Sequence, residues 1–423
     1  MTRPKRILFL SQMFEPEPVY KGLSFVRALQ DRGYEVDVAT GFPNFPLGKL
    51  YPGYKLRPIR RDVIDGVRVT RLPLYPSHDA SGLKRALNYL SFFASVTLYL
   101  LFRWRRYDLI YVYHPPITVS LAAAVAGLVR RTPFLVEVQD LWPEAVASSG
   151  MANPKIVGPL GAACRFVYRR ARRIIAQSRG MAAEIARRGG GERVRPVLNW
   201  AEEADLHRPG TTDLTPYGLE GRFSFVFGGN MGPHQALGTA LDAAFKAAEV
   251  EPRIRLVLVG AGVEVEALRR RAVADGRDIV RVLPGIPRPQ VAGLFEAADV
   301  LFVHLADKPV YEITVPSKTQ FYLGMGKPIL AGVAGEAAEI LRAAEAGVVV
   351  PPEDVDALAD AMIRLARTPR EELARMGESG RTFYRQNLSF AAGMERITQV
   401  MEEAIARKVP TRTQAETVGS PAP

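Results

Sequence analysis

One short segment of this chain brings together an acid, a Pro-Ser turn and a lysine: Glu312, Pro316-Ser317 and Lys318. A strand-like run at residues 300–303 comes before the segment, and a helix-like run at residues 320–325 follows it. In doubly wound parallel sheets, ligands bind at the carboxyl ends of the strands, and a helix N-terminus there attracts phosphate. The pattern predicts a site that grips a nucleotide diphosphate with a reactive group attached.

Two further candidates stand at the ends of strand-like runs in the first half of the chain. His114 follows the run at 109–113 and enters a Pro-Pro loop, while Asp140 follows the run at 134–138. Because parallel strands end at one edge of a sheet, we expect the two side chains on the same rim. The alternatives are a purely structural histidine and an N-cap for a helix beginning at Pro143.

Glycines follow the first strand-like run of each half. Gly22 closes a loop that contains Lys21 but lacks the G-x-G-x-x-G pattern, so the usual dinucleotide fingerprint is absent. Gly229, followed by Asn230, stands after the run at 223–227. Glycines there let backbone N–H groups approach a phosphate, and a tight turn is the alternative.

The chain has 423 residues, 48% of them apolar, which predicts two or three domains with proper cores. Its net charge of +12 is uneven: residues 1–205 hold 31 Lys/Arg against 17 Asp/Glu, and the remainder hold 25 against 27. This excess is either spread over solvated faces or directed at an anionic partner such as lipid headgroups or a phosphate-linked substrate. Nucleic acid is not expected, because exposed aromatics are not interleaved with the basic residues.

The single cysteine, Cys164, rules out an intramolecular disulfide framework and favours a reducing compartment. Residues 7–10 are too short for the apolar core of a secretory signal. The five histidines are scattered, so no metal site is expected. We therefore expect a cytoplasmic location, peripheral on the inner face of the cell membrane.

Strand-like and helix-like runs alternate in two series, which predicts an α/β protein with two parallel sheets covered on both faces. We expect a first Rossmann-like domain at 1–205, a second at 206–385, a C-terminal helix at 386–407 that crosses back to the first, and a disordered tail at 408–423. The two sheets are expected to face each other across a cleft.

Residues 87–102 break this pattern, because they are strongly apolar and flanked by basic residues. Sixteen residues are few for a transmembrane helix, and polar residues interrupt the run. The alternatives are a buried core helix and a helix in the membrane interface, with Tyr89, Tyr99 and Trp104 near the headgroups.

Several short runs, taken in order, make almost the whole chain resemble the retaining glycosyltransferases of family 4, which have the GT-B fold. The branch that it resembles most is that of the surface-polysaccharide N-acetyl-fucosamine and colanic-acid-type transferases. The runs are Thr40-Gly41-Phe42-Pro43-Asn44-Phe45-Pro46, Asp140-Leu141-Trp142-Pro143-Glu144, Asn199-Trp200, Gly229-Asn230-Met231-Gly232, Val315-Pro316-Ser317-Lys318 and Gly326-Lys327-Pro328.

The resemblance implies transfer of a sugar, possibly N-acetylated and deoxygenated, from a nucleotide-diphosphate donor, most simply UDP. The acceptor would be a polyprenyl-diphosphate-linked saccharide at the membrane surface, and neither a cofactor nor a metal is implied. The implied catalytic residues are His114, Asp140 and Glu312. The implied donor-binding residues are Gly22, Gly229, Asn230, Pro284, Gly285, Val315, Ser317, Lys318 and Gln320.

The chain departs from the family pattern at two points. Glu312 matches the first acid of the E-x7-E motif, but the second acid is replaced by Gln320 or Phe321, depending on the alignment. The Arg/Lys pair that many relatives carry after the second domain's first strand is also absent, and Asn230 stands in its first slot. The charge that holds the diphosphate therefore falls on Lys318 and backbone amides. Two other functions stay open: a UDP-sugar 2-epimerase and a catalytically inactive nucleotide-sugar-binding subunit.

Overall fold

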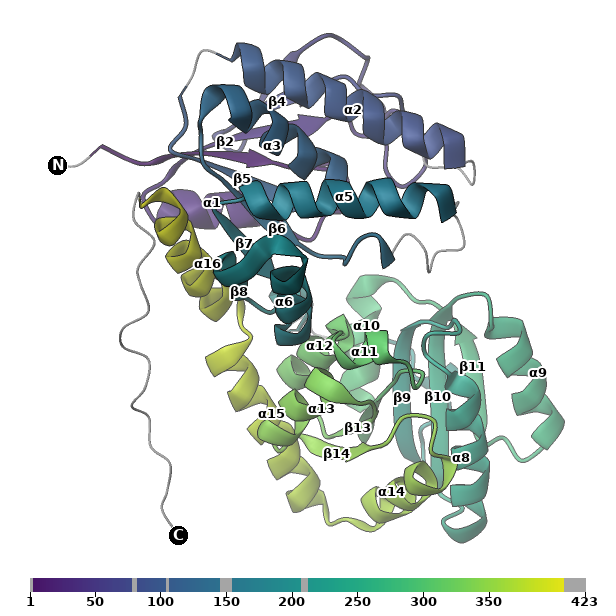
Figure 1. Ribbon diagram of the computed structural model, residues 1–423. Coiled ribbons are helices and arrows are strands. Elements are labelled where there is room, and N and C mark those ends of the chain that lie inside the picture. The colour runs from purple at the N-terminus through teal and green to yellow at the C-terminus, as the bar shows by residue number, and fades with distance from the viewer. Residues whose placement is uncertain (1–2, 78–81, 104–105, 145–153, 207–211, 407–423) are drawn as a thin grey trace, which may run out of the picture. The chain divides into compact units, whose positions relative to one another are not determined.

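A computed structural model gives the structure of the chain and describes every residue except 1–2, 78–81, 104–105, 145–153, 207–211 and 407–423 (Figure 1). The expected tail at 408–423 and Trp104 lie outside the described residues. The chain divides into two compact units. Unit 1 holds the residues up to Ala176, Glu184–Arg195 and the chain from Arg396 onward, and unit 2 holds Gln177–Ala183 and Pro196–Glu395.

Unit 1 is built on a sheet with the strand order β3-β4-β2-β1-β5-β6-β7-β8. In this spatial order, all neighbouring strands from β4 through β2, β1, β5 and β6 to β7 are parallel. Strand β3 lies at the edge of the sheet and is antiparallel to β4. The strands are β1 (Arg6–Leu10), β2 (Glu35–Gly41), β3 (Arg60–Ile64), β4 (Val67–Leu72), β5 (Leu109–His114), β6 (Phe134–Val138), β7 (Arg173–Ala176) and β8 (Val194–Pro196). The main helices are α1 (Leu23–Asp31), α2 (Gly82–Phe102), α3 (Ile117–Arg130) and α5 (Pro154–Arg170).

Unit 2 is built on a parallel sheet with the order β11-β10-β9-β12-β13-β14. Its strands are β9 (Phe223–Asn230), β10 (Ile254–Ala261), β11 (Val280–Pro284), β12 (Val300–His304), β13 (Ile329–Gly332) and β14 (Gly347–Val350). The helices around it are α7 (Glu203–Leu206), α8 (Leu237–Val250), α9 (Val265–Asp275), α10 (Arg288–Ala297), α11 (Pro309–Glu312), α12 (Ser317–Met325), α13 (Gly335–Ala343), α14 (Val355–Arg367) and α15 (Arg370–Asn387). Two further helices, α6 (Arg179–Ile185) and α16 (Phe390–Ile405), have residues in both units.

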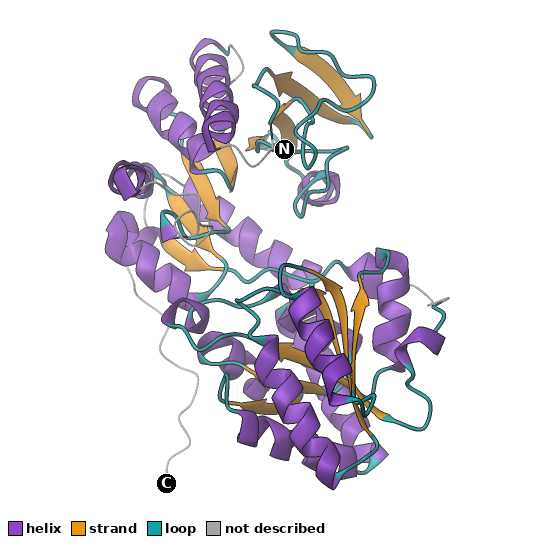
Figure 2. Ribbon diagram, turned by 90° about the vertical axis from the view of Figure 1, so that its right-hand side faces the viewer, coloured by secondary structure: helices purple, strands orange, loops and turns teal. Residues whose placement is uncertain are grey.

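The sheet of unit 2 has helices on both faces (Figure 2) and one apolar core on each face. Successive side chains of a strand point to opposite faces, so Phe225 of β9 packs with α8 and α14, while its neighbour Val226 packs with α10 and α12. Strands buried on both faces read as continuous apolar runs, which is why the sequence displayed them clearly. The predicted α/β class and the doubly wound parallel sheets are confirmed.

The loop between β1 and α1 in unit 1 is held by buried charges. The carboxylate of Glu17 accepts hydrogen bonds from the backbone N–H groups of Asn44 and Phe45, at 2.8 and 2.9 Å. Lys21 forms an ion pair with Glu137 of β6, and both side chains are buried. The loop that ends at Gly22 is therefore fixed to the body of unit 1.

Helix α2 has one buried and one exposed apolar stripe. Phe92, Val96 and Leu100 are buried at four-residue spacing, as expected of a helix packed on one side. The opposite side exposes large apolar side chains, among them Leu90 at 57% and Phe102 at 80%. By length and composition α2 is able to cross a membrane, and 22% of its apolar window is buried. Helix α2 is therefore not wholly buried, and its exposed side is apolar where an ordinary surface helix would be polar.

Replacing Lys21 by methionine should cost stability, because Glu137 would stay buried without its cation. We expect the free energy of unfolding to fall by about 3–5 kcal/mol, measured by urea denaturation. The matched control is Lys5→Met, which breaks a partly exposed ion pair with Glu402 and should cost less than about 1 kcal/mol. Equal effects of the two substitutions would show that the buried pair does not fix this loop.

Candidate functional site

The carboxyl ends of β9, β10 and β11 meet at a surface lined by glycine, which we call the glycine edge (Gly228, Gly229, Gly260 and Gly285). Gly229 pairs with Gly260 in the parallel register of β9 and β10. A Cβ on Gly260, whose φ is +157°, would lie 1.8 Å from the carbonyl oxygen of Gly229. Side chains are thus excluded, and the backbone lies open where a phosphate would bind.

The amino group of Lys318 lies over the glycine edge. A Cβ on Gly229, whose φ is +135°, would be 2.9 Å from Lys318 Nζ, so glycine suits this backbone conformation and lets the lysine lie close to it. Nζ also lies 4.7 Å from the ring centroid of Phe227, within the range of a cation–π contact. No carboxylate pairs with Lys318 among the described residues, and burial lowers its pKa from 10.5 to about 8. A desolvated cation without a counter-ion is the electrostatic condition for binding an anion.

Lys318 stands in the first turn of α12, whose N-terminus has no side-chain cap. Uncapped backbone N–H groups and the helix dipole add to its attraction for negative charge. Ser317, the first residue of the helix, is exposed, whereas Val315 is buried in the core. Gln320 is buried, and its side-chain amide lies 2.7 Å from the carbonyl oxygen of Pro316, where its nitrogen donates. Gln320 thus bonds the start of its own helix.

Glu312 ends the short helix α11, beyond the carboxyl end of β12, and is exposed. Its backbone packs against Gly335, where a Cβ would lie 2.1 Å from the carbonyl oxygen of Glu312. The neighbouring Tyr311 hydroxyl contacts Nδ1 of His234, which ties α11 to the loop after β9. Because β9, β12 and β13 are adjacent, Glu312 and Lys318 stand at the same edge of the sheet.

The loop after β9 is organised by residues that sequence reasoning did not select. The side-chain oxygen of Gln235 accepts hydrogen bonds from Asn230 Nδ2 at 3.3 Å and from the Gly232 N–H at 3.1 Å. The backbone oxygen of Gln235 in turn lies 2.8 Å from Nδ1 of His304, whose Nε2 accepts from the N–H of Glu353. The imidazole is therefore a neutral tautomer that positions the loop. Its place at the end of β12 was the only sequence signal for this role.

Pro284 and Gly285 follow at the end of β11 and are exposed. A Cβ on Gly285 would be 3.6 Å from the Cα of Gly260, so these residues border the glycine edge. Of the predicted donor-binding residues, those that line this edge are Gly229, Asn230, Pro284, Gly285 and Lys318.

In unit 1, His114 and Asp140 end adjacent strands, because His114 pairs with Val138 in the register of β5 and β6. His114 is buried, and neither ring nitrogen has a hydrogen-bond partner among the described residues. Burial lowers the pKa of His114 to about 3, so the ring is neutral at physiological pH. The ring packs edge-on against Trp142, which also meets Tyr89 of α2. Asp140 is exposed just beyond β6.

Gly22 serves a different purpose from a phosphate loop. Glu15 Oε1 accepts a hydrogen bond of 2.6 Å from the N–H of Leu23, the first residue of α1. A Cβ on Gly22 would lie 2.1 Å from that same oxygen. The protein's own carboxylate thus occupies the N-terminus of α1, where an anionic ligand would otherwise bind. Elsewhere among the described residues, no group of three or more His, Cys, Asp or Glu residues is arranged to hold a metal.

Two family descriptions match the chain over different stretches. The Glycosyl transferase 4-like domain matches residues 23–200, and the domain of Glycosyl transferases group 1 matches residues 222–368. Each stretch is therefore similar to a glycosyltransferase domain, and the two matches together span more than half of the chain. The predicted resemblance is confirmed at this level.

Individual proteins agree with this assignment. The probable glycosyltransferase WbjE of Pseudomonas aeruginosa is 26% identical over 273 residues, which is 62% of this chain and 66% of that protein, just under two thirds of its length. Among solved structures, HepE of Anabaena in complex with UDP has a TM-score of 0.59 at 17% identity, covering 94% of this chain and 99% of that one. Sucrose-phosphate synthase of Thermosynechococcus elongatus has a TM-score of 0.64 at 17% identity, covering 95% and 99%. At these identities the structures establish the fold, which is GT-B.

Lys318→Met should stabilise the protein at pH 7, because it removes a partly buried charge that has no ion-pair partner among the described residues. The pKa of Lys318 is lower in the folded than in the unfolded chain, so the unfolded chain binds more protons between about pH 8 and 10.5. The free energy of unfolding of the wild type therefore rises with pH through this window. We expect a gain of about 2–4 kcal/mol for the variant at pH 7, shrinking by roughly half at pH 9.5.

Urea denaturation at both pH values measures this difference. Lys246→Met, which removes an exposed lysine paired with Asp356, is the control and should change stability by less than about 1 kcal/mol. A Lys318→Met variant less stable than the wild type at pH 7 would contradict the unpaired charge.

Proposed function

We propose that the protein transfers a sugar, with retention of anomeric configuration and without an essential metal, from a nucleotide-diphosphate sugar to a lipid-linked saccharide. UDP is the favoured donor nucleotide, since HepE was solved with UDP and with UDP-glucose. The proposed pathway is cell-surface polysaccharide or glycan synthesis, and the proposed sugar is an N-acetylated deoxy-sugar. The protein would work in the cytoplasm on the inner face of the cell membrane.

The observation that carries the proposal is the unpaired ammonium of Lys318 over the glycine edge. A diphosphate bound there would contact Nζ, the open backbone of β9 and β10, and the uncapped first turn of α12. When the bond from the sugar to the diphosphate breaks, negative charge grows on the leaving oxygen. A fixed cation and aligned N–H groups stabilise that charge without rearranging. Glu312, at the same edge, is proposed to hold hydroxyls of the donor sugar.

The acceptor is assigned to the edge of unit 1 that carries His114 and Asp140. The neutral imidazole of His114 offers one N–H donor and one acceptor nitrogen, both without partners among the described residues. A hydrogen bond from a ligand hydroxyl would stabilise this buried ring strongly, because leaving a buried ring nitrogen without a hydrogen bond costs about 1–3 kcal/mol. Asp140 is the proposed partner for a second hydroxyl or for the incoming proton.

The exposed stripe of α2 supports a membrane-bound acceptor. Leu83, Leu87 and Leu90 lie on one side of the helix and are exposed. Each would contribute about 1.5–3 kcal/mol if it entered an apolar phase. The excess of positive charge in residues 1–205 suits the anionic inner leaflet. Tyr89 of α2 meets Trp142, so the helix lies next to the proposed acceptor edge.

Lys318→Met should weaken UDP binding by about 10–100-fold, which is the effect of losing a hydrogen bond to a charged group. Lys318→Arg keeps the positive charge, so its affinity for UDP should fall less than that of Lys318→Met. Isothermal titration calorimetry with UDP measures both, and Lys246→Met is the control that should bind as the wild type does. UDP binding that is unchanged in Lys318→Met would remove the lysine from the donor site.

Glu312→Ala should lower turnover by orders of magnitude while leaving UDP affinity nearly unchanged, because the carboxylate is assigned to the sugar. Turnover is followed as UDP released from a panel of UDP-sugars in the presence of a membrane lipid extract. Glu266→Ala on α9 is the matched exposed control. Near-normal turnover in Glu312→Ala would exclude Glu312 from the reaction, and tight UDP binding without turnover in the wild type would favour the inactive-subunit alternative.

Replacing Leu83 and Leu90 together by glutamate should weaken co-sedimentation with phosphatidylglycerol vesicles at least tenfold. Because both side chains are exposed, the melting temperature should change little. Val273→Glu, an exposed position on α9 of unit 2, is the control. Equal vesicle binding by wild type and double variant would refute the role of α2.

A further inference from the structure

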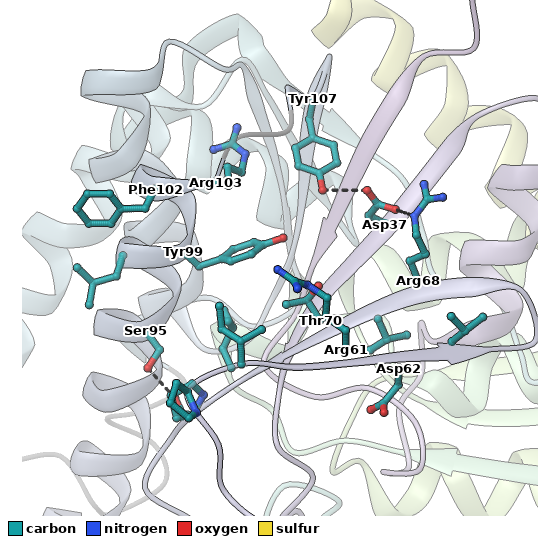
Figure 3. A pocket seen from close by; sticks show the side chains of 17 residues that line it. Asp37, Arg61, Asp62, Arg68, Thr70, Ser95, Tyr99, Phe102, Arg103 and Tyr107 are labelled. Carbon is teal, nitrogen blue, oxygen red and sulfur yellow. Dashed lines mark hydrogen bonds and ion pairs between the residues drawn. The ribbon is translucent and has the colours of Figure 1, made fainter.

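A groove of about 870 Å³ separates the C-terminal half of α2 from the edge hairpin of β3 and β4 (Figure 3). In the antiparallel register, Arg61 stands opposite Thr70 and Val63 opposite Arg68, and these residues line the side of the hairpin that faces the helix. Figure 3 shows Tyr99 pointing from α2 toward the strands, on the side where Arg61 lies. The volume is within the range of pockets that bind small ligands.

The groove has apolar walls that stay exposed. Val63 is 71% exposed and Phe102 is 80% exposed, and Ile59 and Leu98 are also exposed. Single exposed apolar side chains are common on protein surfaces, but several of them along one groove indicate a binding site for an apolar ligand. All of them belong to unit 1.

The charges in the groove are not balanced. Its acids already have partners: Asp37 binds Arg68 and Tyr107, and Asp62 binds Arg60 and Arg71.

Its other two guanidinium groups have no carboxylate partner among the described residues. Arg61 is exposed without an ion pair, and Arg103 is 8% exposed with its Nε unsatisfied. Burial lowers the pKa of Arg103. An anionic group in this groove would meet two cations that no carboxylate among the described residues neutralises.

The groove lies away from the proposed acceptor edge. Tyr89 of α2 lies next to that edge and precedes Arg103 by fourteen residues. At a rise of 1.5 Å per residue, the two residues are roughly 20 Å apart along the helix axis. The groove runs along β4, from Arg68 near its start to Leu72 at its end, and the strands β2 and β1 separate β4 from β5, which ends at His114. A ligand here would therefore not occupy the reaction site.

We propose that this groove binds one anionic phospholipid of the membrane, with an acyl chain between α2 and the hairpin and its phosphate against Arg61 and Arg103. The lipid would continue the apolar surface of α2 into the bilayer and hold unit 1 at an anionic leaflet. This goes beyond the proposed transferase activity, because it assigns a lipid that is neither donor nor acceptor.

The test is calorimetric titration of the full chain with lysophosphatidylglycerol below its micelle concentration. We expect saturable binding, at least tenfold tighter than that of lysophosphatidylcholine, whose headgroup carries no net charge. Val63→Glu and Arg61→Glu should each weaken lysophosphatidylglycerol binding at least tenfold and leave UDP binding unchanged. Both positions are exposed, so the variants should fold, as circular dichroism and thermal melting would verify.

Arg27→Glu is the matched charge-reversal control, because Arg27 is an exposed residue of α1 that does not line the groove. It should bind lysophosphatidylglycerol as the wild type does. Wild-type affinity in both groove variants, or equal affinity for the two lysolipids, would overturn the proposal. Tighter binding of farnesyl diphosphate that competes with lysophosphatidylglycerol would also overturn it, since the groove would then serve an isoprenoid acceptor. Failure of UDP binding by the wild type would count against the transferase proposal and leave this one standing.

Discussion

The proposed donor site depends on one unfavourable interaction: the ammonium of Lys318 is partly withdrawn from water, and no carboxylate among the described residues balances it. The fold imposes this position, because α12 begins beside the ends of β9 and β12, and because Gly229 leaves room for the lysine. Natural proteins rarely keep such a charge unless a ligand completes it. The open backbone of the glycine edge and the uncapped start of α12 point to the same kind of ligand.

The N-termini of α1 in unit 1 and α12 in unit 2 differ in how their charges are satisfied. In unit 1, the β1–α1 loop is closed by the chain's own acids: Glu15 caps α1, and Glu137 neutralises Lys21. In unit 2, α12 has no side-chain cap, and Lys318 has no carboxylate partner among the described residues. A site that is already satisfied cannot select a phosphate, whereas an unsatisfied one can. This contrast is the physical reason for proposing the nucleotide diphosphate at α12 and not at α1, even though both units contain doubly wound sheets.

Much of the fold was visible in the sequence, because strands buried on both faces appear as apolar runs: β6 begins and ends where the run at 134–138 was expected. The hairpin edge was missed although Asp65-Gly66, both with positive φ, is a common hairpin turn. Its strand β3 is short and charged, as exposed edge strands often are, and so lacks an apolar pattern.

The site was predictable only in part. Lys318 and Gly229 were found by their places at element ends, but the support from Gln235 and His304 and the closure of Gly22 by Glu15 depend on contacts between distant residues.

Proton linkage tests the central claim most directly. Calorimetric titration of the protein with UDP at pH 8.5, in two buffers of different ionisation enthalpy, measures the protons exchanged on binding. If the diphosphate becomes the counter-ion of Lys318, the pKa of the lysine must rise from about 8. Binding of UDP to the wild type should then take up more than half a proton per protein molecule. The Lys318→Arg variant should take up none. Absence of proton uptake in the wild type, or release of protons, would contradict the account.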